Sequence, residues 1–262
     1  MTISDRPLRD AHALVTGGSR GIGAAIADAL AHAGAAVTIL GRDAARLDEH
    51  AALLRGGGAT VQALACDVTD DAQVAATFRK AARRLGPIGI LVNNAGTAES
   101  APAHETTRAL WDRMLAVNLT ATYVCTVQVL PGMVAAGHGR IVNVASTAGL
   151  RGYRTMSAYC AAKHAVIGYT RAVALETAAQ GVTVNAVCPG YTDTDLTETA
   201  VDNLVHALGD TREEARARIV RIIPRGTMTS PAEVADAVAW LCAPSSGAIT
   251  GIALPVAGGE VA

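Results

Sequence analysis

The sequence predicts an α/β protein built on a doubly wound parallel sheet of about seven strands, with helices on both faces. Short runs rich in Val, Ile and Leu alternate with longer Ala-rich stretches of helical periodicity. The strand runs are almost continuously apolar, which is typical of parallel strands that are buried on both faces. Each strand–helix–strand step takes about 20–30 residues, the length of a parallel crossover unit.

The expected elements follow one another in a regular order. Thr69 is the expected N-cap of the third helix, and Pro231 is expected at the first position of the last helix. The expected strands span residues 11–16, 36–40, 61–67, 88–93, 140–145, 182–187 and 252–256. The expected helices span residues 24–33, 43–55, 70–85, 107–136, 157–180, 195–208, 211–222 and 231–242.

The chain shows no sign of a division into parts. It contains no linker, internal repeat or low-complexity tract, so we expect one domain over residues 1–262. The stretch 189–230 is long for a connection, and long connections in compact domains tend to be functional. Within it, we expect residues 191–225 to form a lid over a substrate site.

The composition excludes several classes of protein. The chain of 262 residues is 50% hydrophobic and 17% charged, which suits a large core and is unlike a disordered chain or a coiled coil. A net charge of −1 and 3% aromatic residues provide no basic field or stacking platform, so we expect no nucleic-acid partner. No apolar run reaches the length of about 18 residues that a membrane span needs, and no signal peptide is evident, so we expect no membrane partner.

Cysteine and histidine usage predicts a reducing compartment and no metal site. The five cysteines are scattered and form no C-x-x-C pair, so we expect reduced thiols in a cytoplasmic protein. The seven histidines show no H-E-x-x-H or paired spacing, so metal catalysis has no support. The absence of a G-x-S-x-G elbow likewise argues against hydrolase chemistry.

A glycine-rich turn follows the first expected strand. It has the pattern T-G-x-x-x-G-x-G over residues 16–23 and runs directly into a helix. Glycines allow positive φ and let the backbone approach a pyrophosphate, while the helix N-terminus offers free N–H groups to that anion. We therefore expect a dinucleotide phosphate site here, formed by Gly17, Ser19, Arg20, Gly21, Ile22 and Gly23.

Basic residues near this turn favour NADP(H) as the cofactor. At the end of the second strand, where an acidic residue would favour a free ribose 2′-hydroxyl, the chain has Gly41 and Arg42. Arg20 lies within the glycine turn itself. Two guanidinium groups suit a 2′-phosphate, because arginine binds phosphate oxygens in a bidentate fork. The alternatives are a solvated Arg42 and NAD(H) as the cofactor.

Further motifs extend this pattern along nearly the whole chain. They are Cys66-Asp67-Val68, Asn93-Asn94-Ala95-Gly96, Asn118, Ser146, Tyr159-Cys160-Ala161-Ala162-Lys163, Pro189-Gly190 and Gly258-Gly259. In this order and spacing, with Ser146 thirteen residues before Tyr159, they resemble the short-chain dehydrogenase/reductase family in its single-domain branch. The extended branch fits less well, because its members are longer and have a different glycine spacing. The resemblance implies a Rossmann fold and ketoreductase-type activity.

The resemblance also implies roles for residues that follow the strands. Asp67 and Val68 would lie beside the adenine, and Asn94 beside the ribose and the sheet edge. Thr192 and Thr194 would meet the nicotinamide carboxamide. The cofactor-binding residues implied in this part of the chain are Asp67, Val68, Asn94, Ala95, Gly96, Tyr159, Lys163, Pro189, Gly190, Thr192 and Thr194.

Four polar residues form the expected catalytic set. Tyr159 and Lys163 are four apart in a helical pattern, so both side chains project from one face. A nearby ammonium would stabilise the phenolate, and lowering the tyrosine pKa from about 10 to about 7 takes about 4 kcal/mol. Ser146 would hydrogen-bond the same substrate oxygen. By the resemblance, Lys163 also holds the nicotinamide ribose, and Asn118 holds a water in a proton relay.

Some positions depart from the family pattern. Gly89 stands where an Asp is common, which we interpret as a packing change without catalytic consequence. Gly137 and Gln180 stand where fatty-acid reductases place basic residues for an acyl carrier protein, so that partner is not expected. Arg151 and Arg154 could meet an anionic substrate such as an acyl-CoA, although ordinary exposed arginines are the simpler interpretation.

The predicted activity is reversible reduction of a ketone or 3-oxoacyl thioester with NADP(H). An NAD-dependent secondary-alcohol or 3-hydroxyacid dehydrogenase is the alternative, and a cofactor-sensing regulator without turnover is the rival outside enzymes. By the resemblance we expect a homo-oligomer, commonly a tetramer, that assembles through the helices expected at residues 107–136 and 157–180.

Overall fold

A computed structural model describes residues 6–261, so the outermost residues of the expected domain lie outside it. Its seven strands form one sheet in the order β3-β2-β1-β4-β5-β6-β7, and every neighbouring pair is parallel. The predicted doubly wound sheet is therefore confirmed. The strands are β1 His12–Thr16, β2 Ala36–Gly41, β3 Val61–Ala65, β4 Ile90–Asn93, β5 Gly139–Val144, β6 Val182–Pro189 and β7 Ala253–Val256.

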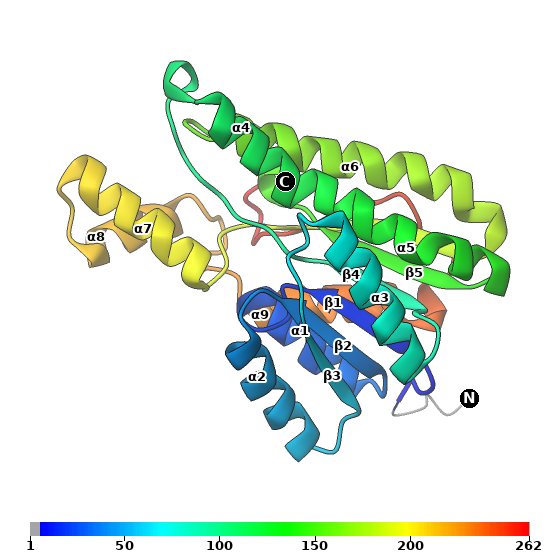
Figure 1. Ribbon diagram of the computed structural model, residues 1–262. Coiled ribbons are helices and arrows are strands. Elements are labelled where there is room, and N and C mark those ends of the chain that lie inside the picture. Colours follow the sequence, from blue (N-terminus) through cyan, green and yellow to red (C-terminus); the bar gives the residue numbers. More distant parts are fainter. Residues whose placement is uncertain (1–5, 262) are drawn as a thin grey trace.

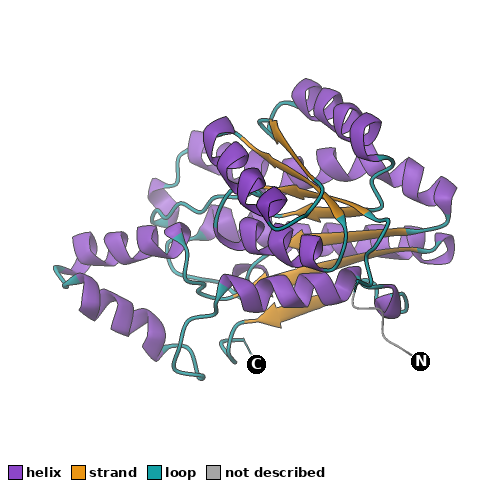
Figure 2. Ribbon diagram, turned by 90° about the horizontal axis from the view of Figure 1, so that it is seen from below, coloured by secondary structure: helices purple, strands orange, loops and turns teal. Residues whose placement is uncertain are grey.

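Helices cover both faces of this sheet (Figures 1 and 2). On one face, α1 and α9 pack over the strands, and on the other, α3 and α5 do. The helices are α1 Gly21–His32, α2 Ala44–Gly56, α3 Asp71–Leu85, α4 Arg108–Leu115, α5 Ala121–Ala136, α6 Ser157–Thr177, α7 Asp195–Leu208, α8 Arg212–Arg221 and α9 Pro231–Cys242.

The strands are mostly apolar because helices cover both faces of the sheet. In β1, Ala13 and Val15 belong to the core under α1 and α9, whereas Leu14, which points the other way, belongs to the core under α3 and α5. All three side chains are fully buried. The continuous apolar runs of the sequence are the consequence of this two-sided packing.

The strand order reverses next to β1, and this reversal determines where a ligand would bind. The chain runs outward from β1 to β2 and β3, and then returns to place β4 on the other side of β1. In open α/β sheets, ligands bind in the crevice outside the carboxyl ends of the strands at such a point. The glycine turn after β1 and Asn94 after β4 both lie there.

Two details of the local predictions were wrong. Asp70, not Thr69, is the N-cap of α3, and its side chain accepts a hydrogen bond from the Gln73 amide. Thr69 donates both its amide and its hydroxyl to Asp67, so it belongs to the turn before the helix. The helix expected over residues 107–136 is interrupted by a π-helical turn, Ala116–Thr120, between α4 and α5.

By length and hydropathy alone, the helical stretch Arg108–Ala136 is long and apolar enough to cross a membrane. Its α5 part instead places Val124, Cys125 and Val129 in the core that α3, α5 and the sheet share. We therefore interpret it as a core helix of the sheet protein.

Candidate active site

The glycine turn is tied to the neighbouring strand by Asn94. The Asn94 side-chain amide donates to the carbonyls of Thr16 and Gly17, at 2.9 and 3.2 Å. The Thr16 hydroxyl accepts the amides of Asn94 and Ala95, both at 3.0 Å. Sequence reasoning missed the role of Thr16, although its place at the end of the first strand was a usable signal. These bonds fix the end of β4 against the turn that follows β1.

The turn leaves its backbone free for an anion. Gly17 and Gly21 have φ of +67° and +54°, which an L side chain rarely adopts. A Cβ atom on Gly23 would lie 2.1 Å from the Gly17 carbonyl oxygen, so only glycine fits there. Helix α1 has no side-chain cap and no acidic residue in its first turn. These features fit a dinucleotide pyrophosphate at the α1 N-terminus. Ser19 and Ile22 are partly buried in the same segment.

The two arginines expected at a 2′-phosphate are placed differently from each other. Arg42 is exposed directly after β2, and its charge is one cause of the lowered pKa of Asp67, after the hydrogen bonds that this carboxyl receives from Thr69. Arg20 is also exposed, but it forms an ion pair with Asp195 at the start of α7. The structure thus places Arg42 beside the expected adenosine pocket and links Arg20 to the predicted lid. Val68, next to Asp67, is buried.

Asn118, Lys163 and Gly96 come together behind the carboxyl end of β4. Asn118 lies within the π turn, and its amide donates to the carbonyls of Thr97 and Met114, at 2.9 and 3.0 Å. Its Oδ1 accepts from the Thr97 amide at 3.3 Å. A Cβ atom on Gly96 would lie 2.8 Å from Asn118 Oδ1 and 3.6 Å from Lys163 Nζ. The Asn118 side chain therefore holds the segment that follows β4.

Ser146 and Tyr159 meet at the next strand end. Ser146 follows β5, where its hydroxyl accepts the amide of Ala148 at 3.1 Å. Its hydrogen bond with Tyr159 favours the phenolate, but burial outweighs it and raises the pKa of Tyr159 to about 12. Tyr159 packs in a small apolar cluster with Met114 and Ala148. The phenol is thus a buried group that keeps its proton at neutral pH.

The prediction that Lys163 lowers the pKa of Tyr159 is wrong for the protein alone. Lys163 Nζ lies 5.7 Å from the Tyr159 ring centroid and donates to the Val144 carbonyl at 2.9 Å. Burial lowers the pKa of Lys163 to about 8, so its charge is itself costly at this position. Desolvation is the largest cause of the pKa shift of both side chains. The expected pairing on one helix face is nevertheless present, because both side chains leave α6 toward the strand ends.

The segment Pro189–Thr194 closes the site on the β6 side. Thr192 is buried, and its hydroxyl donates to the Gly190 carbonyl at 3.1 Å. The Thr194 hydroxyl donates to the Thr192 carbonyl at 3.3 Å. A Cβ atom on Gly21 would lie 3.3 Å from Thr194 Cγ2, so the start of the predicted lid touches the glycine turn. The residues expected at the two ends of a dinucleotide thus share one edge of the sheet.

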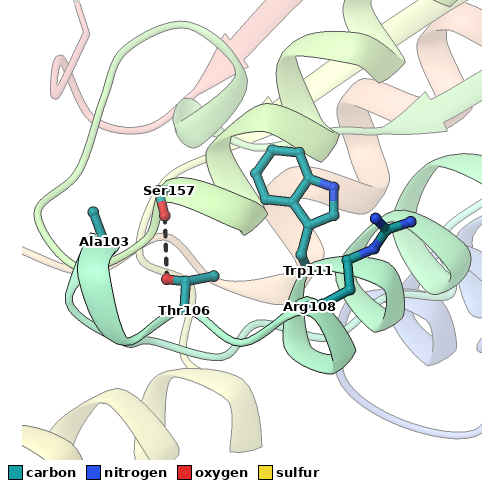
Figure 3. A pocket seen from close by; sticks show the side chains of 5 residues that line it. All are labelled: Ala103, Thr106, Arg108, Trp111 and Ser157. Atoms are coloured by element: carbon teal, nitrogen blue, oxygen red, sulfur yellow. Dashed lines mark hydrogen bonds between the residues drawn. The ribbon is translucent and has the colours of Figure 1, made fainter.

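A separate surface hollow of about 410 Å³ lies between the N-terminal ends of α4 and α6 (Figure 3). Thr106 and Ser157 face each other across it, with their hydroxyl oxygens 3.5 Å apart. Its lining contains none of the predicted catalytic residues; it consists of Ala103, Thr106, Arg108, Trp111 and Ser157. Within residues 6–261, no cluster of three potential metal ligands is present either.

The parallel sheet, its strand order and the helices on both faces define a Rossmann-type fold. The family model described as short chain dehydrogenase matches residues 11–205. The "Granaticin polyketide synthase putative ketoacyl reductase 1" of Streptomyces violaceoruber is 41% identical over 249 residues, which cover 94% of this chain and 92% of that protein. The "2-(S)-hydroxypropyl-CoM dehydrogenase 3" of Xanthobacter autotrophicus is 39% identical and covers 95% of both.

Among solved structures, a variant of the actinorhodin polyketide ketoreductase with NADPH has a TM-score of 0.93 to this chain. The two are 38% identical, and the match covers 96% of this chain and 97% of that one. The chain belongs to the short-chain dehydrogenase family. It is therefore an oxidoreductase that acts on a secondary alcohol or ketone, with a cofactor of the NAD(P)(H) type.

Proposed function

We propose that the protein reduces a ketone or a 3-oxoacyl thioester with NADPH. The observation that carries this proposal is the placement of Ser146, Tyr159 and Lys163 at the strand ends that lie beside the glycine turn. A reduced nicotinamide held there would supply the hydride. The chain's own residues would then have to orient the carbonyl and deliver a proton to its oxygen.

Tyr159 is suited to the proton-donating direction. Because burial keeps its pKa at about 12, the phenol carries its proton at neutral pH and can give it to a carbonyl oxygen. The Ser146 hydroxyl, which hydrogen-bonds Tyr159, would contact the same oxygen as negative charge develops there. Lys163, buried near the Tyr159 ring, would stabilise the phenolate that remains and hold the nicotinamide ribose.

A ketone panel tests this proposal directly. The purified protein is mixed with ketones and 3-oxoacyl thioesters, with NADPH or NADH, and the loss of reduced-nicotinamide absorbance is followed. We expect turnover with at least one substrate and a preference for NADPH. Binding of NADPH without oxidation on any carbonyl would contradict the proposal and favour a cofactor-sensing regulator.

The choice between the two cofactors depends on Arg42. We expect Arg42→Asp to weaken NADPH binding about tenfold or more, because a carboxylate repels a 2′-phosphate. The variant should bind NADH at least as tightly as the wild type does, because a carboxylate accepts a hydrogen bond from a 2′-hydroxyl. Arg79→Asp makes the same charge change at an exposed position on α3 and is the matched control. Equal affinities for both cofactors in the wild type would refute the NADP(H) assignment.

An NAD-dependent alcohol or 3-hydroxyacid dehydrogenase is the second candidate. One observation favours it: Arg20 is paired with Asp195, which leaves Arg42 as the guanidinium beside the expected adenosine pocket. In the same panel, this candidate predicts faster oxidation of a secondary alcohol with NAD than with NADP.

We also propose that the chain forms a homotetramer through α4, α5 and α6. Large apolar side chains are exposed on these helices, with Tyr123 50% and Leu175 84% accessible in the single chain. Pairing such surfaces between copies would bury them. Light scattering tests the proposal, and a monomer at micromolar concentration would overturn it.

A further inference from the structure

The chain end turns back into the molecule after β7. Gly258 and Gly259 have φ of +58° and +90°, and the Glu260 amide donates to the Ala257 carbonyl at 3.1 Å. This left-handed turn directs the Glu260 side chain inward, where none of it is exposed to solvent. The Gly258-Gly259 motif packs against residues 223–225, where the Arg225 amide donates to the Gly258 carbonyl at 3.0 Å, and it also places this carboxyl group.

The Glu260 carboxyl is held by the loop between Ser146 and Tyr159. Its Oε1 accepts from the Tyr153 hydroxyl and from Arg151 Nη2, the latter at 3.3 Å. Arg151 Nη1 also donates to the Glu260 backbone carbonyl at 3.2 Å. The Arg151 guanidinium lies 4.6 Å from the Tyr153 ring centroid, so the three side chains form one cluster. Arg151 is thus a structural partner of Glu260. The sequence analysis interpreted Arg151 as an ordinary exposed arginine and did not predict this partner.

The second carboxyl oxygen lies against another part of the site. Oε2 is buried and has no hydrogen-bond partner among residues 6–261. A Cβ atom on Gly190 would lie 2.5 Å from it, so it contacts the backbone that follows β6. A buried acceptor without a partner is costly, which makes this group an unusual choice for simple packing. One carboxyl group therefore contacts both segments that border the substrate side of the site.

Tyr153 connects this cluster to the reacting groups. Its ring packs in the apolar cluster that contains Tyr159, Met114 and Ala148. Its hydroxyl lies 2.8 Å from the hydroxyl of Thr147, the residue that follows Ser146. A shift of Tyr153 would therefore displace both the segment that follows Ser146 and the apolar cluster around Tyr159.

We infer that Glu260 is a positioning residue, which fixes the loop of residues 147–153 and thereby the substrate side of the site formed by Ser146 and Tyr159. This inference rests on the proposed function for its kinetic consequence. The hold on the loop itself is independent of any activity. Glu260 holds the loop on the substrate side of the site. Its loss should therefore weaken the binding of a ketone more than the binding of NADPH.

The test compares Glu260→Gln, Tyr153→Phe and the double variant with the wild type. Glu49→Gln, which makes the same change at an exposed position on α2, is the matched control. Hydrogen exchange is followed at the amides of residues 149–151, which are bonded to carbonyls of Ser146 and Thr147. In Glu260→Gln we expect these amides to exchange about tenfold faster.

The kinetic arm separates positioning from general stability. We expect Glu260→Gln to raise the KM for a ketone about fivefold or more, while the Kd for NADPH stays within about twofold of the wild type. The double variant should be no worse than the less active single variant, because both changes weaken the hydrogen bond between residues 153 and 260. Glu49→Gln should match the wild type in every readout.

Two results would overturn the inference. One is exchange at residues 149–151 that is the same in Glu260→Gln as in Glu49→Gln, whether or not the wild type has activity. The other is a lower melting temperature with unchanged exchange and KM, which would make Glu260 a stabilising residue only. Failure of the wild type on every carbonyl would instead refute the proposed function, and the exchange result alone would then decide the inference.

Discussion

The carboxyl edge of the sheet and the segment 191–225 are built by opposite means. At the sheet edge, Asn118, Tyr159 and Lys163 are buried, and backbone carbonyls bind the polar atoms of the first and third. In the segment 191–225, α7 and α8 lie to one side of the layers (Figures 1 and 2). The ion pairs that link α7 to α8 are exposed or partly exposed, and they join Arg212 and Arg216 to Glu198 and Asp202.

This difference means that the side chains at the sheet edge are held rigidly, whereas α7 and α8 can change position. Buried groups with backbone partners cannot move without breaking bonds in a low-dielectric interior, so the proposed chemistry is preorganised. The apolar cluster of Val201, Ala215 and Ile219 packs α7 and α8 against each other. The ion pairs around it are worth little each, so the two helices can shift together at small cost. We therefore propose that the sheet edge determines the type of reaction and that the segment 191–225 determines the choice of substrate.

Tyr159→Phe should have the largest effect, because it removes the proposed proton donor from the rigid edge. We expect kcat/KM to fall about 1000-fold, within the range of general acid catalysis. NADPH affinity and the melting temperature should stay close to those of the wild type. Tyr169→Phe removes a half-buried hydroxyl from the same helix, α6, and is the control. A Tyr159→Phe variant as active as the wild type would refute the catalytic assignment.

Gly96→Ala should have the second-largest effect on activity, because it adds an atom at the carboxyl edge of the sheet, where there is no space for it. The new Cβ would lie 2.8 Å from Asn118 Oδ1, so Asn118 or the backbone must shift. We expect kcat/KM to fall about 10- to 100-fold in a folded protein, as small displacements in an active site do. Gly89→Ala is the matched control, because nothing lies within 4 Å of the atom that it adds. Equal activities of the two variants would show that the edge tolerates movement.

The fold and most of the predicted site followed from sequence patterns that have a local cause. Two-sided burial produces the apolar strands, and the strand–turn–helix step produces the glycine turn, so both could be predicted. The π turn at Asn118 could not be predicted, because the segment looks uniformly helical and the bond of Asn118 to Thr97 is a tertiary contact. Thr69 was chosen as a cap by residue type alone, whereas Asp70 was equally suitable.

Long-range electrostatics were the least predictable part. The pairing of Arg20 with Asp195 joins positions far apart in the chain, and neither residue type indicates its partner. The same holds for Glu260, whose burial depends on the Arg151 and Tyr153 side chains. For Lys163 and Tyr159, burial is the largest cause of both pKa shifts. The depth of burial is a property of the tertiary structure, so the sequence did not reveal it.

The buried Lys163 should make stability depend on pH. Its pKa is 10.5 in the unfolded chain and about 8 in the folded one. Between these values the unfolded chain binds the proton and the folded chain does not, so the free energy of unfolding rises with pH. From pH 7 to 9.5 we expect a gain of about 1–2 kcal/mol relative to Lys163→Met, measured by urea unfolding.

Ionisation of Tyr159 sets the upper limit of the pH range in which stability rises. Its pKa rises from 10 in the unfolded chain to about 12 in the folded one. Above about pH 10 the folded chain therefore holds a proton that the unfolded chain has lost, and stability falls again.

Parallel pH profiles of the wild type and Lys163→Met between pH 7 and 9.5 would show that Lys163 is more exposed than the structure indicates.

Glu198→Ala should have the smallest effect on stability, although it removes two ion pairs at once. Glu198 binds Arg212 and Arg216, which join α7 to α8. Because these pairs are partly exposed, the free energy of unfolding should change by less than about 1 kcal/mol. The KM for a ketone should rise a few-fold, since looser helices order less well over a substrate. Glu213→Ala, on α8 and without an ion pair among residues 6–261, is the control. A large loss of stability in Glu198→Ala alone would mean that this segment is as rigid as the sheet edge, and the contrast between the two regions would fail.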